Sequence, residues 1–197
     1  MNTREEMLAR MRRSQPAPVA LPELPGFANG DSSAAADYDS FAAALERMGG
    51  KLAPAPAGGD ADAAVRALFP EAKVICSATH EVRGTRPLDP AQPPATLDDV
   101  DVGVVRAVFG VAETGSVLLT ETELQVEALG FLAQHLVVLL DPARIVATLH
   151  DAYRHPAFTQ ARYAILMTGP SATADIEGVL IHGAQGIRSL TLLPHAG

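Results

Sequence analysis

Short apolar stretches alternate with amphipathic stretches along most of the chain, and this alternation predicts its fold class. The apolar stretches predict strands at 72–76, 102–109, 116–120, 136–140, 163–168 and 189–193. Helical spacing of apolar residues predicts helices at 37–48, 60–69, 142–153 and 173–183. Apolar strands separated by helices are typical of a mostly parallel sheet with helices on both faces. We therefore predict an α/β fold.

The beginning of the chain follows a different pattern. Residues 1–13 have the spacing of a helix, with a methionine-rich apolar side surrounded by arginines. Residues 14–36 are rich in Pro, Gly and Ser, which is typical of a linker or a wrapping arm. The sequence therefore predicts two parts, an N-terminal helix with a flexible arm at 1–36 and one α/β domain at 37–197.

Composition limits the classes of function. With 48% hydrophobic residues among 197, the chain can form a sizeable core. Its net charge of −8 argues against a protein that coats nucleic acid or an anionic membrane. No apolar run approaches the roughly 18 residues of a membrane span. The first residues lack the apolar stretch of a secretory signal, so export is not expected.

The cysteine count excludes some cofactors. Cys76 is the only cysteine, so this chain can form no intrachain disulfide and no four-thiolate zinc or iron–sulfur site. We expect no cofactor held by this chain alone and a cytoplasmic location, where thiols stay reduced. Any redox chemistry then requires a partner protein or a diffusible cofactor.

A turn with two glycines, residues 110–116 (GVAETGS), lies between two predicted strands. The glycines permit a tight turn or a close backbone approach to a ligand. Glu113 lies at a strand end, where a carboxylate can serve as general base, nucleophile or hydrogen-bond acceptor. The alternative is an ordinary hairpin turn, with Glu113 solvated and Thr114 satisfying backbone groups.

A second motif, residues 166–177 (LMTGPSATADIE), joins a predicted strand to a predicted helix. Free amides at a helix start attract anions, and the Ser171 and Thr173 hydroxyls can donate to a carboxylate or a phosphate. The alternative is that these residues only cap the helix, with Asp175 and Glu177 complementing its dipole. The motif therefore predicts either a small-anion site or a helix cap.

The histidines and the loop arginines indicate a ligand or metal site less strongly than the two motifs do. The histidines do not have the spacing of metal ligands, so no metal site is predicted. His135 directly precedes a predicted strand, where its ring can point into a cleft. Arg83 and Arg86 lie in the irregular, proline-rich stretch 77–100 and either clamp an acidic ligand or remain solvated.

Three blocks together resemble the LUD-domain family: VFGVAETGSVLLT, FLAQHLVVLLDPARIV and GPSATADIEGVLIHGAQGIRSLTLL. They cover roughly residues 100–193. The resemblance implies a fold akin to the NagB/RpiA/CoA-transferase-like superfamily. It also implies a role beside iron–sulfur partner proteins in the oxidation of L-lactate to pyruvate. The short members of the family carry no cluster, which agrees with the single cysteine.

The resemblance also indicates which positions to examine, although it supplies no established catalytic residue. The matching motif positions are Glu113, Thr114, Gly115, His135, Gly169, Ser171, Thr173, Asp175 and Glu177. The family often has Gly-x-His-Gly-Pro before the last strand, and this chain has Gln185 in place of that histidine. Because an amide cannot transfer protons as an imidazole does, a catalytic role for this turn is doubtful here.

Three hypotheses follow. In the leading one, the chain is an accessory component of a lactate-oxidising system and binds a small carboxylate or phosphorylated ligand between the two motifs. In the second, it is a stand-alone enzyme of the CoA-transferase or sugar-phosphate type that uses Glu113. In the third, it is a non-catalytic interaction module whose first helix docks on a partner.

Overall fold

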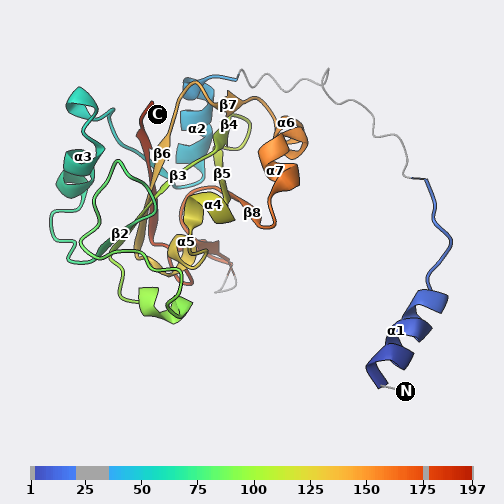
Figure 1. Cartoon of the computed structure of the whole chain (residues 1–197). Helices are drawn as coiled ribbons and strands as arrows, with labels where there is room; N and C mark the ends of the chain where they lie inside the picture. The colour runs from blue at the N-terminus through green and yellow to red at the C-terminus, as the bar shows by residue number, and fades with distance from the viewer. Residues whose placement is uncertain (1–2, 21–35, 175–177, 197) are drawn as a thin grey trace. The chain divides into compact units, whose positions relative to one another are not determined.

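The computed structural model describes residues 3–20, 36–174 and 178–196 (Figure 1). The chain divides into two units, residues 1–30 and residues 31–197. In the first, helix α1 spans Thr3–Arg13, as the sequence predicts. Acidic residues lie in its first turn and basic residues in its last turn, which complements the helix dipole. None of its residues is buried.

The second unit is built on a five-stranded parallel sheet, sheet A, with the order β1-β11-β6-β3-β2. Its strands are β1 (Lys51–Leu52), β2 (Ile75–Ser77), β3 (Val102–Arg106), β6 (His135–Leu140) and β11 (Ser189–Pro194). The first residues of β3 and β6 are register partners, and so are the first residues of β6 and β11. The amino ends of these three strands therefore meet at one edge of the sheet.

Alternating side chains of sheet A face two separate cores. In β6, Val137 and Leu139 pack toward helix α3 (Ala61–Leu68), while the even-numbered apolar residues pack toward helix α2 (Tyr38–Arg47). Figure 1 shows α3 on one side of the sheet and α2 on the other. Apolar residues fill both faces, as expected of a parallel sheet covered on both sides. The predicted α/β fold with a mostly parallel sheet is confirmed.

A second, mixed sheet, sheet B, shares the α2 side. It has the order β7-β4-β5-β8, with β4 (Phe109–Val111), β5 (Ser116–Thr120), β7 (Ile145–Val146) and β8 (Ala164–Met167). One face packs into the core beside sheet A, and the other is covered by α6 (Leu149–Arg154) and α7 (Pro156–Gln160). Short helices α4 (Glu121–Leu124) and α5 (Leu129–Leu132) and 3-10 turns η2 (Ala57–Gly59) and η3 (Pro94–Leu97) complete the connections.

Two predicted elements are divided in the structure. The predicted strand 102–109 is two strands, because Ala107 N donates to Leu139 O in sheet A whereas Val108 N donates to Leu118 O in sheet B. A continuous apolar run contains no signal for such a change of sheet. The predicted helix 142–153 is wrong in its first half, which forms β7. Helix α6 begins only after Thr148, whose side chain and that of Asp151 form a capping box.

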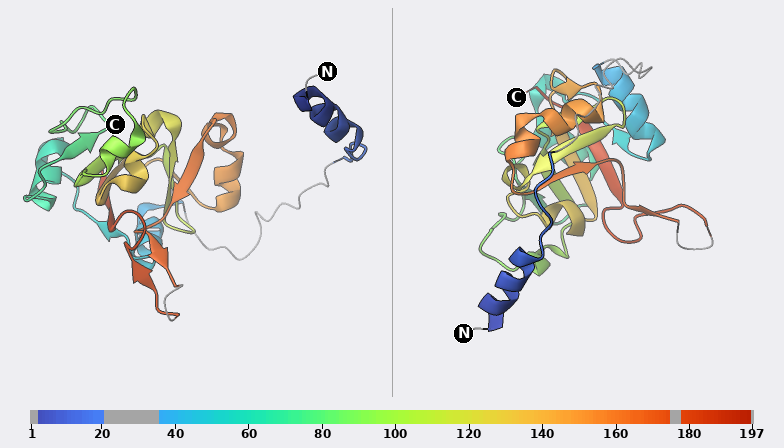
Figure 2. Two further views of the ribbon diagram at one scale, coloured as in Figure 1. Left: turned by 90° about the horizontal axis from the view of Figure 1, so that it is seen from below. Right: turned by 90° about the vertical axis from the view of Figure 1, so that its right-hand side faces the viewer.

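The helix predicted at 173–183 is wrong. Strands β9 (Ala172–Thr173) and β10 (Ile181–His182) form an antiparallel pair, and Figure 2 shows this hairpin projecting from the body of the domain. Gly183 N donates to Ser171 O, and the left-handed backbone of Gly183 (φ +74°) suits a turn. The helix start that was to supply free amides is therefore not formed at Ser171. Asp175 and Glu177 lie outside the described residues.

No helix within the described ranges has the length and apolar character that crossing a bilayer requires.

Candidate functional site

The end of β8 and the loop before β11 enclose a cavity of about 240 Å³, which we call the motif cavity. It is lined by Gly130, Phe131, Met167, Thr168, Gly169, Pro170, Ser171, Gln185, Gly186 and Ile187. Its polar lining consists of hydroxyls, an amide and main-chain groups, and none of these residues carries a charge. The predicted positions Gly169 and Ser171 therefore do face a common cavity, although no helix begins there.

A chain of hydroxyl groups connects this cavity to the GVAETGS turn. Ser116 Oγ, in a residue only 4% exposed, is hydrogen-bonded to Thr168 Oγ1 and lies 2.7 Å from Thr114 Oγ1. Since β5 and β8 are antiparallel neighbours in sheet B, Ser116 meets Thr168 where one strand begins and the other has just ended. The two motifs are thus joined through Thr168, which lines the cavity.

The loop around Gln185 forms the opposite wall. Ser171 N donates to Ile187 O (3.0 Å), and Ser171 Oγ donates to Gln185 O (2.9 Å). These bonds close the loop over the Gly-Pro-Ser segment. Gln185 lines the cavity at the position where the family often has histidine, so a neutral amide replaces a titratable ring in this wall.

Two of the predicted glycines are required by packing on α2. Gly115 (φ +68°) lies so close to α2 that an added Cβ would be 2.2 Å from Leu45 N. For Gly169 (φ +65°), the corresponding distance to Met48 O is 2.5 Å. Both positions therefore need glycine for the left-handed backbone and for the close approach. That approach is made to α2, and Gly169 also lines the motif cavity.

Glu113 lies elsewhere. Its carboxylate oxygen Oε2 accepts a hydrogen bond of 2.8 Å from Leu149 N at the start of α6, and its side chain is exposed. β7, which leads to α6, and β8, which leads to the motif cavity, are opposite edges of sheet B. Among the described residues, those that line the motif cavity do not include Glu113. The structure therefore does not bring Glu113 together with Ser171, and the observed contact of Glu113 is a helix cap.

Thr173 lies in the hairpin, where it is the register partner of Ile181. The Thr173 main chain is thus part of a strand pair, and the helix-capping alternative for this residue is wrong.

His135 lines a second cavity, of about 300 Å³, at the amino edge of sheet A. Its Nδ1 lies 2.8 Å from Ser189 Oγ, and its ring centroid is 5.1 Å from that of Phe69. Burial lowers the pKa of His135, and the positive charges of Lys51 and Arg188 lower it further. The structure therefore separates His135 from Ser171, because the cavity that His135 lines shares no lining residue with the motif cavity.

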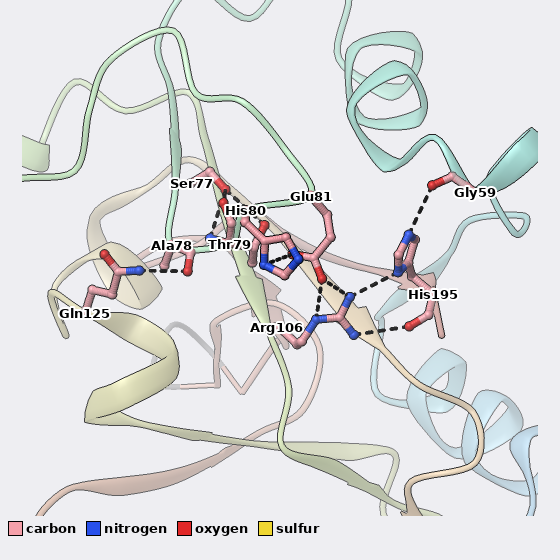
Figure 3. A network of polar contacts seen from close by, with 9 residues as sticks. All are labelled: Gly59, Ser77, Ala78, Thr79, His80, Glu81, Arg106, Gln125 and His195. Atoms are coloured by element: carbon pink, nitrogen blue, oxygen red, sulfur yellow. Dashed lines mark hydrogen bonds and ion pairs between the residues drawn. The ribbon is translucent and has the colours of Figure 1, made fainter. Parts of the chain in front are cut away.

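The opposite, carboxyl edge of sheet A carries a polar network that the sequence analysis missed (Figure 3). Arg106, the last residue of β3, donates through Nε to Glu81 Oε1 (2.8 Å) and through Nη1 to His195 O (3.2 Å). Its Nη2 forms an ion pair with Glu81 and lies 3.0 Å from His195 Nδ1. His195 Nε2 lies 3.1 Å from Gly59 O. A neutral ring protonated at Nε2 satisfies both contacts of His195.

The Glu81–Arg106 pair is largely buried, with side chains 11% and 23% exposed. Burial by itself raises the pKa of Glu81, but hydrogen bonds from its own amide and from Arg106, with the charge of Arg106, lower the pKa overall. Four of the five Arg106 donors are used within the network. The signal in the sequence is Arg106 itself, the one charged residue in the otherwise apolar stretch 102–109.

No group of three or more potential metal ligands comes together among the described residues.

Comparison with known proteins identifies the family. Residues 94–193 match the LUD domain. The chain belongs to the LUD domain family. The match begins at η3 and ends in β11, so it includes the whole motif cavity.

Two further proteins are similar to this chain, and neither assigns a reaction. The LUD chain is 29% identical over 98 residues to "Uncharacterized protein NMB1437" of Neisseria meningitidis serogroup B. The aligned region covers 48% of this chain and 42% of that protein. It thus spans less than half of that relative. The crystal structure of a DUF162 family protein from Deinococcus radiodurans has the same fold, with a TM-score of 0.63 and 16% identity, over 79% of this chain and 94% of that one.

Proposed function

We propose that this LUD-domain chain is an accessory component of an L-lactate oxidation system, of the lactate utilization protein C type, and acts with iron–sulfur partner proteins. The LUD domain family is associated with lactate utilization. The observation that carries the proposal is the family match over residues 94–193, which contains every residue of the motif cavity.

The lining of the motif cavity favours a small monocarboxylate as its ligand. A volume of about 240 Å³ is several times the roughly 30 Å³ that a water molecule occupies in the liquid. The donors for a carboxylate are the side-chain amide of Gln185 and the hydroxyl of Thr168, because the N–H and the O–H of Ser171 already donate to Ile187 O and Gln185 O. A phosphate dianion is the weaker candidate, because the described lining provides no cation to pair with its double charge.

The electron-transfer step is assigned to the partners. Cys76 is completely buried, and one thiolate cannot hold a four-thiolate cluster. In this proposal the LUD chain binds or presents the small carboxylate, and the partner proteins hold the clusters and accept the electrons. The chain is expected in the cytoplasm with those partners.

Growth on L-lactate tests the proposal. The gene is deleted in a host without another lactate dehydrogenase, and the strain is complemented with the wild-type chain, with Thr168→Val/Ser171→Ala, or with Thr159→Ala. Thr159 provides the control because its hydroxyl is exposed on α7, outside the motif cavity. We expect growth with the wild type and the control and poor growth with the double variant. Normal growth of the deletion strain would refute the proposal.

Binding tests the ligand class separately. Amide and methyl NMR shifts of the full chain are followed while L-lactate, pyruvate or inorganic phosphate is added. We expect saturable shifts around Ser171 and Gln185 with the monocarboxylates. Stronger binding of phosphate would contradict the assignment of a monocarboxylate, and no binding of either would remove the cavity from the proposal.

We also propose that α1 supplies the partner contact. An isolated helix of 11 residues is marginal in water, and α1 has no buried residue, with Met7 60% and Met11 62% exposed. Covering these side chains on a partner would stabilise the helix. Association with the iron–sulfur partners is measured for Met7→Glu/Met11→Glu and for Met48→Glu, a control at an exposed methionine of the α/β domain. Loss of association only in the first variant supports docking through α1, and equal association refutes it.

A further inference from the structure

The cavity around His135 has a position and a lining that distinguish it from the motif cavity. It lies where β3 and β6 begin, because Val102 and His135 are register partners. It is lined by Leu68, Phe69, Pro70, Glu71, Ala72, Asp101, Val102 and His135. Its volume of about 300 Å³ is at the lower end of the range of ligand pockets.

The lining presents hydrogen-bond acceptors that nothing in the described structure uses. Asp101 Oδ2 accepts from Lys73 N (2.7 Å) and Val74 N (2.9 Å), whereas Oδ1 accepts from no described residue. Hydrogen bonds from these amides hold the pKa of Asp101 below its usual range, so the carboxylate stays charged at neutral pH. Glu71 adds a second, exposed carboxylate.

His135 is held in one orientation while half of its ring remains available. Ser189 Oγ contacts Nδ1, and the Phe69 ring packs beside the imidazole. Among the described residues, none is hydrogen-bonded to Nε2. The lowered pKa keeps the ring neutral near pH 7, and either tautomer is compatible with a serine hydroxyl, which donates or accepts.

These features select the charge and shape of a ligand. The two carboxylates repel an anion. Positive charges act on His135 from Lys51 and Arg188 and on Asp101 from Lys73, but none of these three residues lines the cavity. The apolar walls, Leu68, Phe69, Pro70 and Val102, suit a flat apolar body. We propose that the His135 cavity is a second ligand site, for a small flat molecule that carries N–H donors and no negative charge, such as an aromatic amine or amidine.

Benzamidine and benzoate provide matched probes, because they share a ring and differ in the charge and hydrogen-bonding of one group. Binding to the full chain is measured by NMR, with the imidazole resonances of His135 as the local signal. We expect saturable shifts with benzamidine and affinity at least ten-fold weaker for benzoate. Equal or tighter binding of benzoate, or no saturable shift with benzamidine, would overturn the proposal.

Single substitutions test whether Asp101 and Glu71 contribute to benzamidine binding. Asp101→Asn and Glu71→Gln are each expected to weaken benzamidine binding by three-fold or more, and Glu46→Gln, at an exposed site on α2, is expected to leave it unchanged. If Asp101→Asn disturbs the fold, Glu71→Gln still tests whether a carboxylate of the cavity attracts benzamidine. The carboxylate of Glu71 forms no hydrogen bond within the described structure, so its replacement should not disturb the fold. Unchanged binding by a folded Glu71→Gln chain would overturn the charge argument.

L-lactate is added in competition with benzamidine. Because the two cavities share no lining residue, we expect no displacement, whether or not lactate binds in the motif cavity. Displacement of benzamidine by lactate would contradict a separate site. If lactate binds nowhere on the chain, that result counts against the monocarboxylate ligand of the proposed function and leaves the His135 cavity proposal unaffected.

Discussion

The two edges of sheet A use their polar residues in opposite ways. At the carboxyl edge, Arg106 directs four donors to Glu81 and His195, and the atom of this network that has no hydrogen-bond partner among the described residues, Glu81 Oε2, is buried. At the amino edge, His135 and Asp101 each keep an atom without a hydrogen bond to any described residue, and both atoms belong to residues that line a cavity. The usual expectation places ligands at the carboxyl edge of a parallel sheet. Here that edge carries a structural network.

The same contrast divides the two sequence motifs. In GVAETGS, Glu113 caps α6 and Gly115 allows close packing on α2. In the other motif, Thr168 and Ser171 face a cavity. The first motif therefore holds the fold, whereas Thr168 and Ser171 of the second line a cavity while they also form hydrogen bonds within the chain. Measurements of stability and of growth on single variants separate these two groups.

Gly115→Ala is expected to have the largest effect. Left-handed backbone costs an alanine roughly 1–2 kcal/mol, and the overlap with the α2 backbone adds roughly 1–3 kcal/mol, so the free energy of unfolding should fall by about 4 kcal/mol. Gly58→Ala is the control, since Gly58 is also left-handed (φ +63°) but an added Cβ has no neighbour within 4 Å. Denaturant unfolding measures both. Equal losses would show that packing on α2 does not require Gly115.

Arg106→Met is expected to lower the free energy of unfolding by about 3 kcal/mol, because it leaves the buried Glu81 carboxylate without its cation. Arg86→Met is the matched control. Its ion pair with Asp99 is exposed, with side chains 36% and 57% exposed, and such pairs contribute at most about 1 kcal/mol. Urea unfolding compares the two. Similar losses would mean that the carboxyl-edge network does not stabilise the fold.

Glu113→Ala should cost about 1 kcal/mol of stability, since Leu149 N loses its acceptor at the start of α6. Glu113→Gln keeps a side-chain oxygen and should remain near the wild type. Growth on L-lactate should be normal for Glu113→Gln if the residue is only a helix cap. A stable Glu113→Gln chain that fails to support growth would restore the hypothesis of an acid–base or nucleophilic role.

The pH dependence of stability gives the smallest expected effect. Because the folded pKa of His135 lies below its ordinary value of 6.5, the unfolded chain binds more protons there, and stability falls as pH drops from about 6.5 toward the folded pKa. Glu81 also has a lowered pKa, so its contribution is present above about 4.5 and is lost only at lower pH. Unfolding of His135→Gln should thus depend less on pH between 7 and 5. An unchanged slope would show that His135 titrates as an exposed histidine.

The sequence predicts most of the fold because strand burial leaves a simple pattern. The apolar runs that become β5, β6 and β11 are recognisable without neighbours. The errors occur where pairing partners decide the structure. The pattern of residues 173–183 predicts a helix, but the described ends of this segment, at 172–173 and 181–182, pair with each other as strands. Local capping signals cannot reveal that pairing.

The sequence predicts the candidate site less completely than the fold, because the contacts of the site residues join parts of the chain that are far apart in sequence. His135 and Ser171, which the sequence places near the ends of predicted strands, line two separate cavities, and Ser171 does so without the predicted helix start. The sequence does not show that Glu113 is directed to α6, because Leu149 lies 36 residues further along the chain. Arg106, Glu81 and His195 are also widely separated in sequence, and only the parallel register of sheet A brings their strand ends together.

Cys76 offers a practical consequence of burial in β2. Its side chain is fully enclosed in the core, and it is the sole thiol among 197 residues. A thiol reagent should therefore modify the native chain only when β2 separates from its neighbours. The labelling rate measures how often the β2 edge of sheet A opens, with no engineered probe and no background from a second thiol. The same enclosure protects the protein from forming mixed disulfides during oxidative stress.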